Sequence, residues 1–365
     1  MSFTIHIWKN MKYIITLALG LVACNLSKKK NNMDSNYAIS TSSESEERAK
    51  SVLPLKGKED VSDLLSLNIK KPVDLRVSEE TKYFANEKYD WIITIEPESN
   101  SYFDRDSISK YFNKEWRANY QNPWLYCIPK NDSKWTYFSS GKEELNELIK
   151  VALGWKLYDN LDSQPSIYDE KTLVKYHNDV NEITKKLNCK LIRENYSARE
   201  AAIKSQELSE FIPENNIYSI IILKADQKFE GKEIWDVMMS LGLKWGDMDL
   251  FHWNNDHDFG DDQLISVWTS TNPGYFFPEE IAAGRVQTED LIFGFSIPRS
   301  IAPKEILEVM YKVANYSQYR LGGQLLDENG LPFDIAKERN KIENVLGNLK
   351  SKSIEPGIGD ALYLF

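Results

Sequence analysis

Few residues in this chain could do chemistry. Three cysteines and four histidines leave little material for a metal site. Cys24 ends a short apolar run, so its thiol could be acylated. Cys127 and Cys189 lie in expected strands, where they could form a disulfide bond or remain two buried free thiols; the sequence leaves both open. The loop NNDHDFGDD carries several acidic residues around His257, so a bound cation has to be considered.

The spacing in this loop does not suit a calcium site. An EF-hand needs oxygen ligands at positions 1, 3 and 5, followed by glycine at position 6. Taking Gly260 as that glycine puts Asn255, His257 and Phe259 on the ligand positions, and phenylalanine has no ligand atom. The chain also lacks the common nucleophile, zinc and phosphate-binding motifs. We therefore expect a solvated hairpin loop, no metal, no cofactor and no enzyme.

Cys24 closes the segment MKYIITLALGLVAC, in which an apolar run over residues 13–23 follows Lys12. A membrane-spanning helix takes about 20 residues, whereas the apolar part of a signal peptide takes about 7–15. The ending LVAC resembles a bacterial lipobox, so we expect a signal peptide over residues 1–24, translation from Met11, and a lipid such as palmitate on Cys24. The alternative is a short uncleaved anchor with the chain in the cytoplasm, which the lysines at 28–30 favour.

The length of the chain suggests about two domains. It has 365 residues and a formal net charge of −10, from 55 acidic against 45 basic residues. Nucleic-acid binders carry basic patches, so this balance argues against a nucleic-acid partner. Residues 25–82 are rich in polar and charged side chains, which cannot offset the entropy of ordering, and we expect them to form a disordered tether.

The second half of the chain alternates strand and helix patterns typical of an α+β fold. Within the helix at 303–319, Ile306, Val309, Met310 and Val313 recur on one side. We expect a domain over residues 214–350, built from an antiparallel or mixed sheet with helices on one face, and a short C-terminal tail over residues 351–365. The expected order is strand 218–224, helix 231–241, strand 247–253, strand 264–270, strand 291–297, helix 303–319, strand 323–328 and helix 335–349.

Residues 83–213 repeat this plan in divergent form. The strand YDWIITIEP is similar to IYSIIILKA at an offset of 128 residues, and LNCKLIRENYSAREAAIKSQEL is similar to LGGQLLDENGLPFDIAKERNKI at an offset of 134. The offsets nearly agree, so we expect two tandem split β-α-β domains that arose by duplication. Trp91–Ile95 and Ser219–Leu223 should then occupy the same place in their sheets.

Several separated motifs carry a family resemblance. The segment IIILKADQKFEGKEIWDVMMSLGLKWGDMDLFHW, the turn NPGYFFPEE and the strand LGGQLLDENG occur in the order found in the C-terminal domain of the ZipA family of bacterial cell-division proteins. The resemblance covers residues 217–349 and extends only weakly to residues 89–208. It implies a non-enzymatic binding domain whose uncovered sheet face takes the C-terminal tail peptide of FtsZ, the tubulin-like division protein.

Strand parity divides the side chains between the two faces of the expected sheet. Phe251, Val267, Phe293, Phe295 and Ile297 should face the helices. The tentative peptide site on the open face consists of Tyr218, Ile220, Met248, Leu250, Trp268, Ser270, Ile292 and Gly294. Asn216, Ser270 and Gly294 stand where the resemblance implies bulky apolar side chains, so the apolar contact should be smaller here.

The partner therefore stays open. One hypothesis is a membrane-tethered protein that binds FtsZ; the alternative is an envelope lipoprotein that uses the fold structurally or for another protein ligand. A lipidated Cys24 would anchor the chain on the periplasmic or surface side of the cell membrane, away from FtsZ. The family's long Pro/Gln-rich linker is also missing. In addition, the open faces of the two domains could pack on each other and leave no site.

Cys24→Ser tests the anchor. We expect this substitution to release the protein from membranes and to abolish labelling by a fatty-acid analogue, because no other residue of the lipobox can carry the lipid. The measurement is membrane fractionation together with metabolic labelling. A variant that stays membrane-bound and uncleaved at residue 24 would instead favour the uncleaved anchor.

Overall fold

The computed structural model describes residues 44–69, 82–98, 101–140, 146–159, 167–257 and 259–365. The chain divides into two compact units, residues 1–75 with 214–365, and residues 76–213. We call the first the discontinuous unit and the second the inserted unit, because the second interrupts the first in the sequence. The signal peptide and lipobox expected over residues 1–24 lie outside the described residues.

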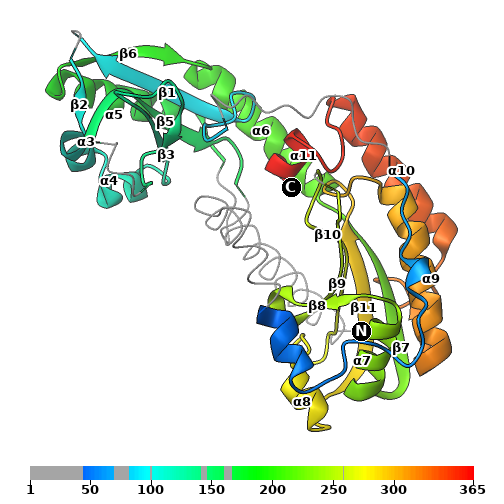
Figure 1. Ribbon diagram of the computed structural model, residues 1–365. Helices are drawn as coiled ribbons and strands as arrows, with labels where there is room; N and C mark the ends of the chain where they lie inside the picture. Colours follow the sequence, from blue (N-terminus) through cyan, green and yellow to red (C-terminus); the bar gives the residue numbers. More distant parts are fainter. Residues whose placement is uncertain (1–43, 70–81, 99–100, 141–145, 160–166, 258) are drawn as a thin grey trace. The chain divides into compact units, whose positions relative to one another are not determined.

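The discontinuous unit contains a six-stranded antiparallel sheet (Figure 1). Its centre is the long pairing of β7 (Tyr218–Glu230) with β11 (Gln287–Ser296). The order across the sheet is β12-β7-β11-β10-β9-β8, with β12 Gln324–Leu326, β10 Gln263–Trp268, β9 Phe251–Asn254 and β8 Lys244–Trp245. The α+β class is thus confirmed, as are the strands expected at 218–224, 264–270, 291–297 and 323–328 apart from their exact ends.

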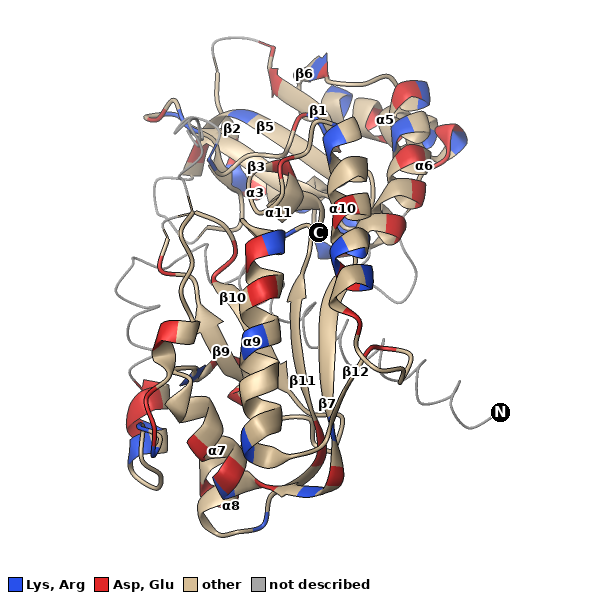
Figure 2. Ribbon diagram, turned by 90° about the vertical axis from the view of Figure 1, so that its right-hand side faces the viewer, with Lys and Arg blue, Asp and Glu red and all other residues tan. Residues whose placement is uncertain are grey.

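Helices cover one face of this sheet. α9 (Pro303–Leu321) lies along β7, β10 and β11, and α10 (Ile335–Ser351) packs on α9. α7 (Gly231–Ser240) follows β7, and the short α8 (Pro278–Ala282) contacts it. Figure 2 shows that Lys, Arg, Asp and Glu gather on helices and loops, whereas β10 carries none. The expected stripe on α9 is confirmed as core: all its residues, Ile306, Val309, Met310 and Val313, are buried.

The register of the strands confirms most of the expected parity. Val267 is opposite Phe293, which is opposite Ile221, and all three are fully buried beneath the helices. On the other face, Ser266, Gly294 and Ile220 form one row across the sheet. Because successive side chains of a strand point to opposite faces, this register fixes which residues remain on the helix-free side.

The strand expected over residues 247–253 begins four residues later than predicted. Asp247–Asp249 form a 3₁₀ turn, η3, in which Met248 and Asp249 have φ of 56° and 58°. The parity assigned to Met248 and Leu250 was therefore wrong, since neither lies in the strand. Phe251 starts β9 and is fully buried, as expected. The cause is local: Gly246 and the flanking aspartates favour a turn.

The tether expected over residues 25–82 was wrong for residues 44–69. This segment is ordered and belongs to the discontinuous unit, beginning with a helix over residues 44–50 whose Ala49 is fully buried. A 3₁₀ turn, η1 (Ser62–Leu64), follows and contacts α9. We call residues 44–65 the strap.

Hydrogen bonds hold the strap on the helices. The buried Trp235 of α7 donates its indole N–H to the carbonyl of Pro54 at 2.7 Å, and Val61 N donates to the carbonyl of Ser240 at 2.9 Å. Gly57 lies so close to Ser240 that a Cβ on it would meet the hydroxyl and backbone of that serine. Polar segments can thus be ordered when a distant helix supplies their partners.

Arg48 fastens the start of the strap. Its guanidinium makes two hydrogen bonds to Glu279, at 2.8 and 3.0 Å, and a third to Asp249 at 3.2 Å. It also lies 5.2 Å from the ring centroid of Trp245 and 5.4 Å from that of Phe277. The arginine is partly exposed, and exposed pairs of this kind contribute at most about 1 kcal/mol, so the buried contacts of Trp235 and Gly57 matter more.

The inserted unit has its own antiparallel sheet, ordered β4-β3-β5-β1-β6, with β2 paired to β5. The strands are β1 Asp90–Pro97, β2 Phe103–Asp104, β3 Trp124–Pro129, β4 Thr136–Tyr137, β5 Glu147–Lys156 and β6 Cys189–Glu194. Its helices are α3 Arg105–Tyr111, α4 Lys114–Asn119, α5 Glu170–Lys186 and α6 Ala198–Asn215. Cys127 and Cys189 are free and buried, so no disulfide forms, and burial raises the pKa of each thiol to about 12.

The two sheets share part of their topology. β1 lies between β5 and the last strand β6, and β7 lies between β11 and the last strand β12. Trp91–Ile95 and Ser219–Leu223 therefore hold the same place in their sheets, as the duplication requires. The other edges differ, because β5 is followed by β3 and β4 whereas β11 is followed by β10, β9 and β8. The duplication stays a prediction.

Gly57→Ala tests the strap. We expect it to lower the free energy of unfolding by about 1–3 kcal/mol, because the added methyl overpacks against Ser240. Hydrogen exchange at Val61 should accelerate as the strap loosens. Gly347→Ala is the matched control: it lies within α10 with open space around its Cα, so it should stabilise the protein by about 0.5–1 kcal/mol. Equal effects of the two variants would show that the strap contact is unimportant.

Candidate functional site on the helix-free face

Apolar side chains line the middle of the face that the helices leave free. Trp268, Ile292 and Ile222 form one row across β10, β11 and β7, and Leu326 of β12 continues it. Ile220 lies in the next row. Ile292 is only 1 % exposed and forms the floor, while Trp268, Ile222 and Leu326 are half-buried. An apolar strip of this kind on a sheet suits the side chains of a bound peptide.

Gly294 shapes this strip. A Cβ on it would lie 2.6 Å from the ring of Trp268, so the glycine leaves the space into which the indole folds. The side chain of Trp268 therefore lies flat across β11 rather than standing away from the sheet. The absence of a bulky group at 294 is thus partly offset by the neighbouring tryptophan, which supplies the apolar surface itself.

The 3₁₀ turn η3 borders the strip at the β9 edge. His252 belongs to the same face and is buried; its Nδ1 lies 2.9 Å from the hydroxyl of Ser266, and its Nε2 lies 2.8 Å from the carbonyl of Asp247. The bond to Asp247 ties η3 to the sheet. Met248 and Leu250 are half-buried within and after that turn, so they border the face even though the expected strand is absent.

A polar cluster closes one end of the face. Arg299 pairs with both carboxylate oxygens of Asp261, at 2.8 and 3.0 Å, and donates to the carbonyl of Leu362 at 3.2 Å. The C-terminal residues are thus part of this unit, ending in α11 (Asp360–Leu364). Tyr218 lies close to this pair, and burial raises the pKa of its phenol to about 12. The tyrosine is therefore a neutral hydrogen-bonding group at neutral pH.

The opposite end is closed by Asp290. Its carboxylate accepts hydrogen bonds from the hydroxyl of Thr269 at 3.0 Å and from Ser270, whose backbone N lies at 2.8 Å and whose hydroxyl lies at 2.5 Å. Ser270, expected as a peptide contact, therefore orders the chain after β10, although the residue itself is exposed. Polar ends around an apolar middle define the length of the candidate site.

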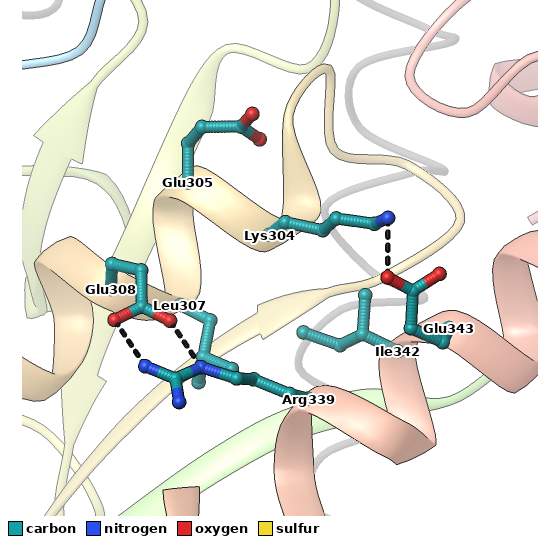
Figure 3. A pocket seen from close by; sticks show the side chains of 7 residues that line it. All are labelled: Lys304, Glu305, Leu307, Glu308, Arg339, Ile342 and Glu343. Carbon is teal, nitrogen blue, oxygen red and sulfur yellow. Dashed lines mark hydrogen bonds and ion pairs between the residues drawn. The ribbon is translucent and has the colours of Figure 1, made fainter. Parts of the chain in front are cut away.

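A groove of about 300 Å³ lies between α9 and α10 (Figure 3). Arg339 makes two hydrogen bonds to Glu308, at 2.7 and 2.9 Å, and Lys304 pairs with Glu343. These pairs bridge the two helices over Leu307 and Ile342. Because four of its five charged side chains are already paired, leaving Glu305, the groove offers less for recognition than the sheet face.

The acidic loop has the hairpin structure expected for it. Asn255 donates its side-chain amide to the carbonyls of Phe259 and Asp261, both at 2.8 Å, and Asp261 is paired with Arg299. Among the described residues, no cluster of three or more His, Cys, Asp or Glu side chains could hold a metal ion. Asp258 lies outside those residues.

Parity placed five of the eight expected residues in strands on this face, whereas Ser270 lies beyond the end of β10 and Met248 and Leu250 lie before β9. It also missed other residues. Ile222 follows Ile220 with the same parity and could have been found. Leu326 and Arg299 could not, because neither a strand pattern nor a motif marks them as neighbours of Trp268 or Tyr218. Their placement depends on how distant segments return to the sheet.

The comparisons concern this unit. Residues 216–343 match the family model described as ZipA, C-terminal FtsZ-binding domain. The cell division protein ZipA of Marinobacter nauticus is 28 % identical over 108 residues, which cover 30 % of this chain and 31 % of that protein. That of Ectopseudomonas mendocina is 29 % identical over 127 residues, which cover 34 % of this chain and 46 % of that protein. The discontinuous unit carries a ZipA C-terminal-like domain.

This result confirms the resemblance read from the sequence. The matching family describes a binding domain, in agreement with the expectation of a non-enzymatic protein. The matches span about a third to a half of the length of these ZipA proteins. In the described part of the chain, no helix combines the length and the apolar character needed to cross a bilayer.

The buried His252 predicts a pH dependence of stability. Burial lowers its pKa below the ordinary value of 6.5, so the native state keeps the ring neutral while the unfolded state protonates it. The stability contributed by the neutral ring is therefore complete above about pH 6.5 and is lost as the pH falls, at up to about 1.4 kcal/mol per pH unit. Urea unfolding from pH 7.5 to pH 5 should show this loss, and His252→Gln should reduce it.

His177→Gln serves as the control. His177 lies on α5 of the inserted unit, half-buried, with Nδ1 2.6 Å from Glu194. Its substitution should leave the decline of the discontinuous unit's stability between pH 7 and pH 5 unchanged. If His252→Gln also leaves that decline unchanged, the buried imidazole does not set the acid limit of the fold.

Proposed function

We propose that this chain is a membrane-tethered, non-enzymatic protein whose discontinuous unit binds the C-terminal tail peptide of FtsZ on its helix-free sheet face. The proposed contacts are the residues expected from the sequence, to which Ile222 and Leu326 are added: Tyr218, Ile220, Ile222, Met248, Leu250, Trp268, Ser270, Ile292, Gly294 and Leu326. A lipid on Cys24 is proposed separately as the anchor, and the side of the membrane on which it holds the chain decides between FtsZ and the alternative given below. The internal duplication of the fold is part of the same proposal.

One observation carries this proposal: an apolar strip on a sheet face without helices, in a domain similar to an FtsZ-binding family. Trp268, Ile222 and Leu326 offer accessible apolar surface above a buried floor of Ile292 and Ile220. Aromatic anchors at the centre of a small interface supply most of its binding free energy. Tyr218 and Arg299 at one end add hydrogen-bonding groups that can fix the direction of a peptide.

The alternative is an envelope lipoprotein that uses the same face for another protein ligand or for structure. Lipidation of Cys24 supports this alternative, because it would place the face on the side of the membrane opposite to FtsZ. A compartment-specific reporter fused after Phe365 distinguishes the two. Activity only outside the cytoplasm would favour the lipoprotein, and activity only inside would keep FtsZ accessible.

Trp268→Ala tests the proposed face. A synthetic peptide of the FtsZ C-terminal tail should bind the full chain, and this substitution should weaken binding at least tenfold, because it removes the central apolar contact. Fluorescence anisotropy of a labelled peptide measures the affinity. Circular dichroism confirms that the variant is folded.

Tyr319→Ala is the matched control. Tyr319 is 84 % exposed on α9, the helix that covers the opposite side of the sheet. It should bind the peptide as the wild type does. Equal losses in both variants would place binding elsewhere, and an absence of binding to the wild type would exclude FtsZ and leave the alternative.

A further inference from the structure

The turn η3, at the border of the helix-free face, has a backbone conformation that side-chain-bearing residues rarely adopt. Met248 and Asp249 have φ of 56° and 58°, in the left-handed region, where residues other than glycine are uncommon. Such a conformation persists only when the surrounding structure fixes it. The contacts that fix η3 therefore decide where Met248 lies beside the apolar strip.

Two of these contacts hold the main chain of η3. The carbonyl of Asp247 lies 2.8 Å from Nε2 of the buried His252, and the carbonyl of Asp249 accepts a hydrogen bond from the backbone N of Phe276 at 2.8 Å. Neither contact involves the side chain of Asp249. That side chain is only 27 % exposed, so its carboxylate also needs a partner.

Arg48 of the strap supplies this partner. Its guanidinium donates to Asp249 at 3.2 Å and twice to Glu279 of α8, at 2.8 and 3.0 Å, so it bridges two carboxylates from different segments. Burial raises the pKa of Asp249, the Arg48 guanidinium opposes this rise, and the charges of Glu279 and Asp247 add to it. Without the guanidinium, the carboxylates of Asp249 and Glu279 would repel each other across this contact.

Aromatic rings hold Arg48 in its place. The guanidinium lies 5.2 Å from the ring centroid of Trp245 on β8 and 5.4 Å from that of Phe277. Trp245 is buried and donates its indole N–H to the carbonyl of Phe276 at 2.7 Å. Because an arginine that stacks on rings still presents its N–H groups to carboxylates, Arg48 has a defined position between β8, α8 and η3.

We propose that Arg48 is a positioning residue for the helix-free face. By bridging Asp249 and Glu279 it holds η3 at the border of this face and so sets the position of Met248 beside the apolar strip. The inference rests on the proposed function, in which Met248 is one of the contacts for the FtsZ tail. Loss of the bridge should weaken binding although no residue that touches the peptide is removed.

Arg48→Ala in the full chain tests the inference with two measurements. The first is the affinity for the labelled FtsZ-tail peptide, which should fall about fivefold, within the range that a partly exposed ion pair can contribute. The second is the methyl resonance of Met248 in protein labelled with ¹³C at the methionine methyl groups, assigned with Met248→Leu. This resonance should move in Arg48→Ala without any ligand, because η3 itself shifts.

The double variant Arg48→Ala/Glu279→Gln separates positioning from attachment of the strap. It should regain most of the lost affinity and return the Met248 resonance towards that of the wild type, because it removes the carboxylate that repels Asp249. If Arg48 served only to fasten the strap, no recovery would occur, since the double variant lacks both partners of that ion pair.

Arg339→Ala is the matched control. Arg339 also makes two hydrogen bonds to a carboxylate, that of Glu308, at 2.7 and 2.9 Å, and both side chains are partly exposed between α9 and α10. This variant should leave the affinity and the Met248 resonance unchanged. An equal loss of affinity in Arg339→Ala would overturn the inference.

The Met248 resonance distinguishes failure of this inference from failure of the proposed function. If the wild type does not bind the FtsZ tail, the proposed function fails, and the resonance still decides whether Arg48 positions η3. An unchanged resonance in Arg48→Ala would overturn the inference, and so would a double variant that behaves like Arg48→Ala.

Discussion

The antiparallel pairing of β7 with β11 is the constraint on which the discontinuous unit depends. It runs from Tyr218 opposite Ser296 to Glu230 opposite Gln287. A slip of β11 by one residue relative to β7 would exchange the two faces of β11, placing Phe293 in solvent and Ile292 beneath the helices. The burial of apolar side chains beneath the helices therefore fixes the register. The register in turn places the residues of the apolar strip on the helix-free face.

The strap imposes a second constraint, on how the chain is organised. Residues 44–65 contact α7 and α9 although the whole inserted unit separates them in sequence. Polar segments can be ordered when their backbone groups find partners, and here the partners are Trp235 and the carbonyl of Ser240. The described strap thus packs on α7 and α9, the helices on the covered side of the sheet.

The features that could be predicted from the sequence are those that short-range periodicity controls. The alternation in β7, β10 and β11 and the stripe on α9 follow from periods of 2 and 3.6 residues, so their faces could be assigned correctly. The prediction for Met248 was wrong because a glycine and two aspartates favour a turn over the strand that the apolar residues suggested. The prediction of a disordered tether was wrong for the strap because its polar composition hides its order. The residues that stabilise it lie about 180 positions away, and no local pattern reveals them. Arg299 was missed for a similar reason, since its partners Asp261 and Leu362 lie 38 and 63 residues away in the sequence.

The helix-free faces of the two sheets share an arrangement of side chains that bears on the proposed duplication. Ile92 is opposite Gly154 in the inserted unit, and Ile220 is opposite Gly294 in the discontinuous unit. The two isoleucines are 128 residues apart, the offset found between the first pair of similar segments. In each sheet the next strand supplies an aromatic ring that folds over the glycine: Tyr126 comes within 3.1 Å of a Cβ on Gly154, and Trp268 within 2.6 Å of one on Gly294.

The two rings also have equivalent places in the ladders. Tyr126 is opposite Ala152 and Trp268 is opposite Ile292, in each case two residues before the glycine. A shared fold class does not require an isoleucine, a glycine and a diagonal aromatic ring at corresponding positions, so this agreement supports descent from one ancestral domain. The two faces differ in what covers them. In the inserted unit the chain's own Phe84 and Ala85 take up much of the surface, whereas in the discontinuous unit the indole of Trp268 leaves the strip beside it accessible to a ligand.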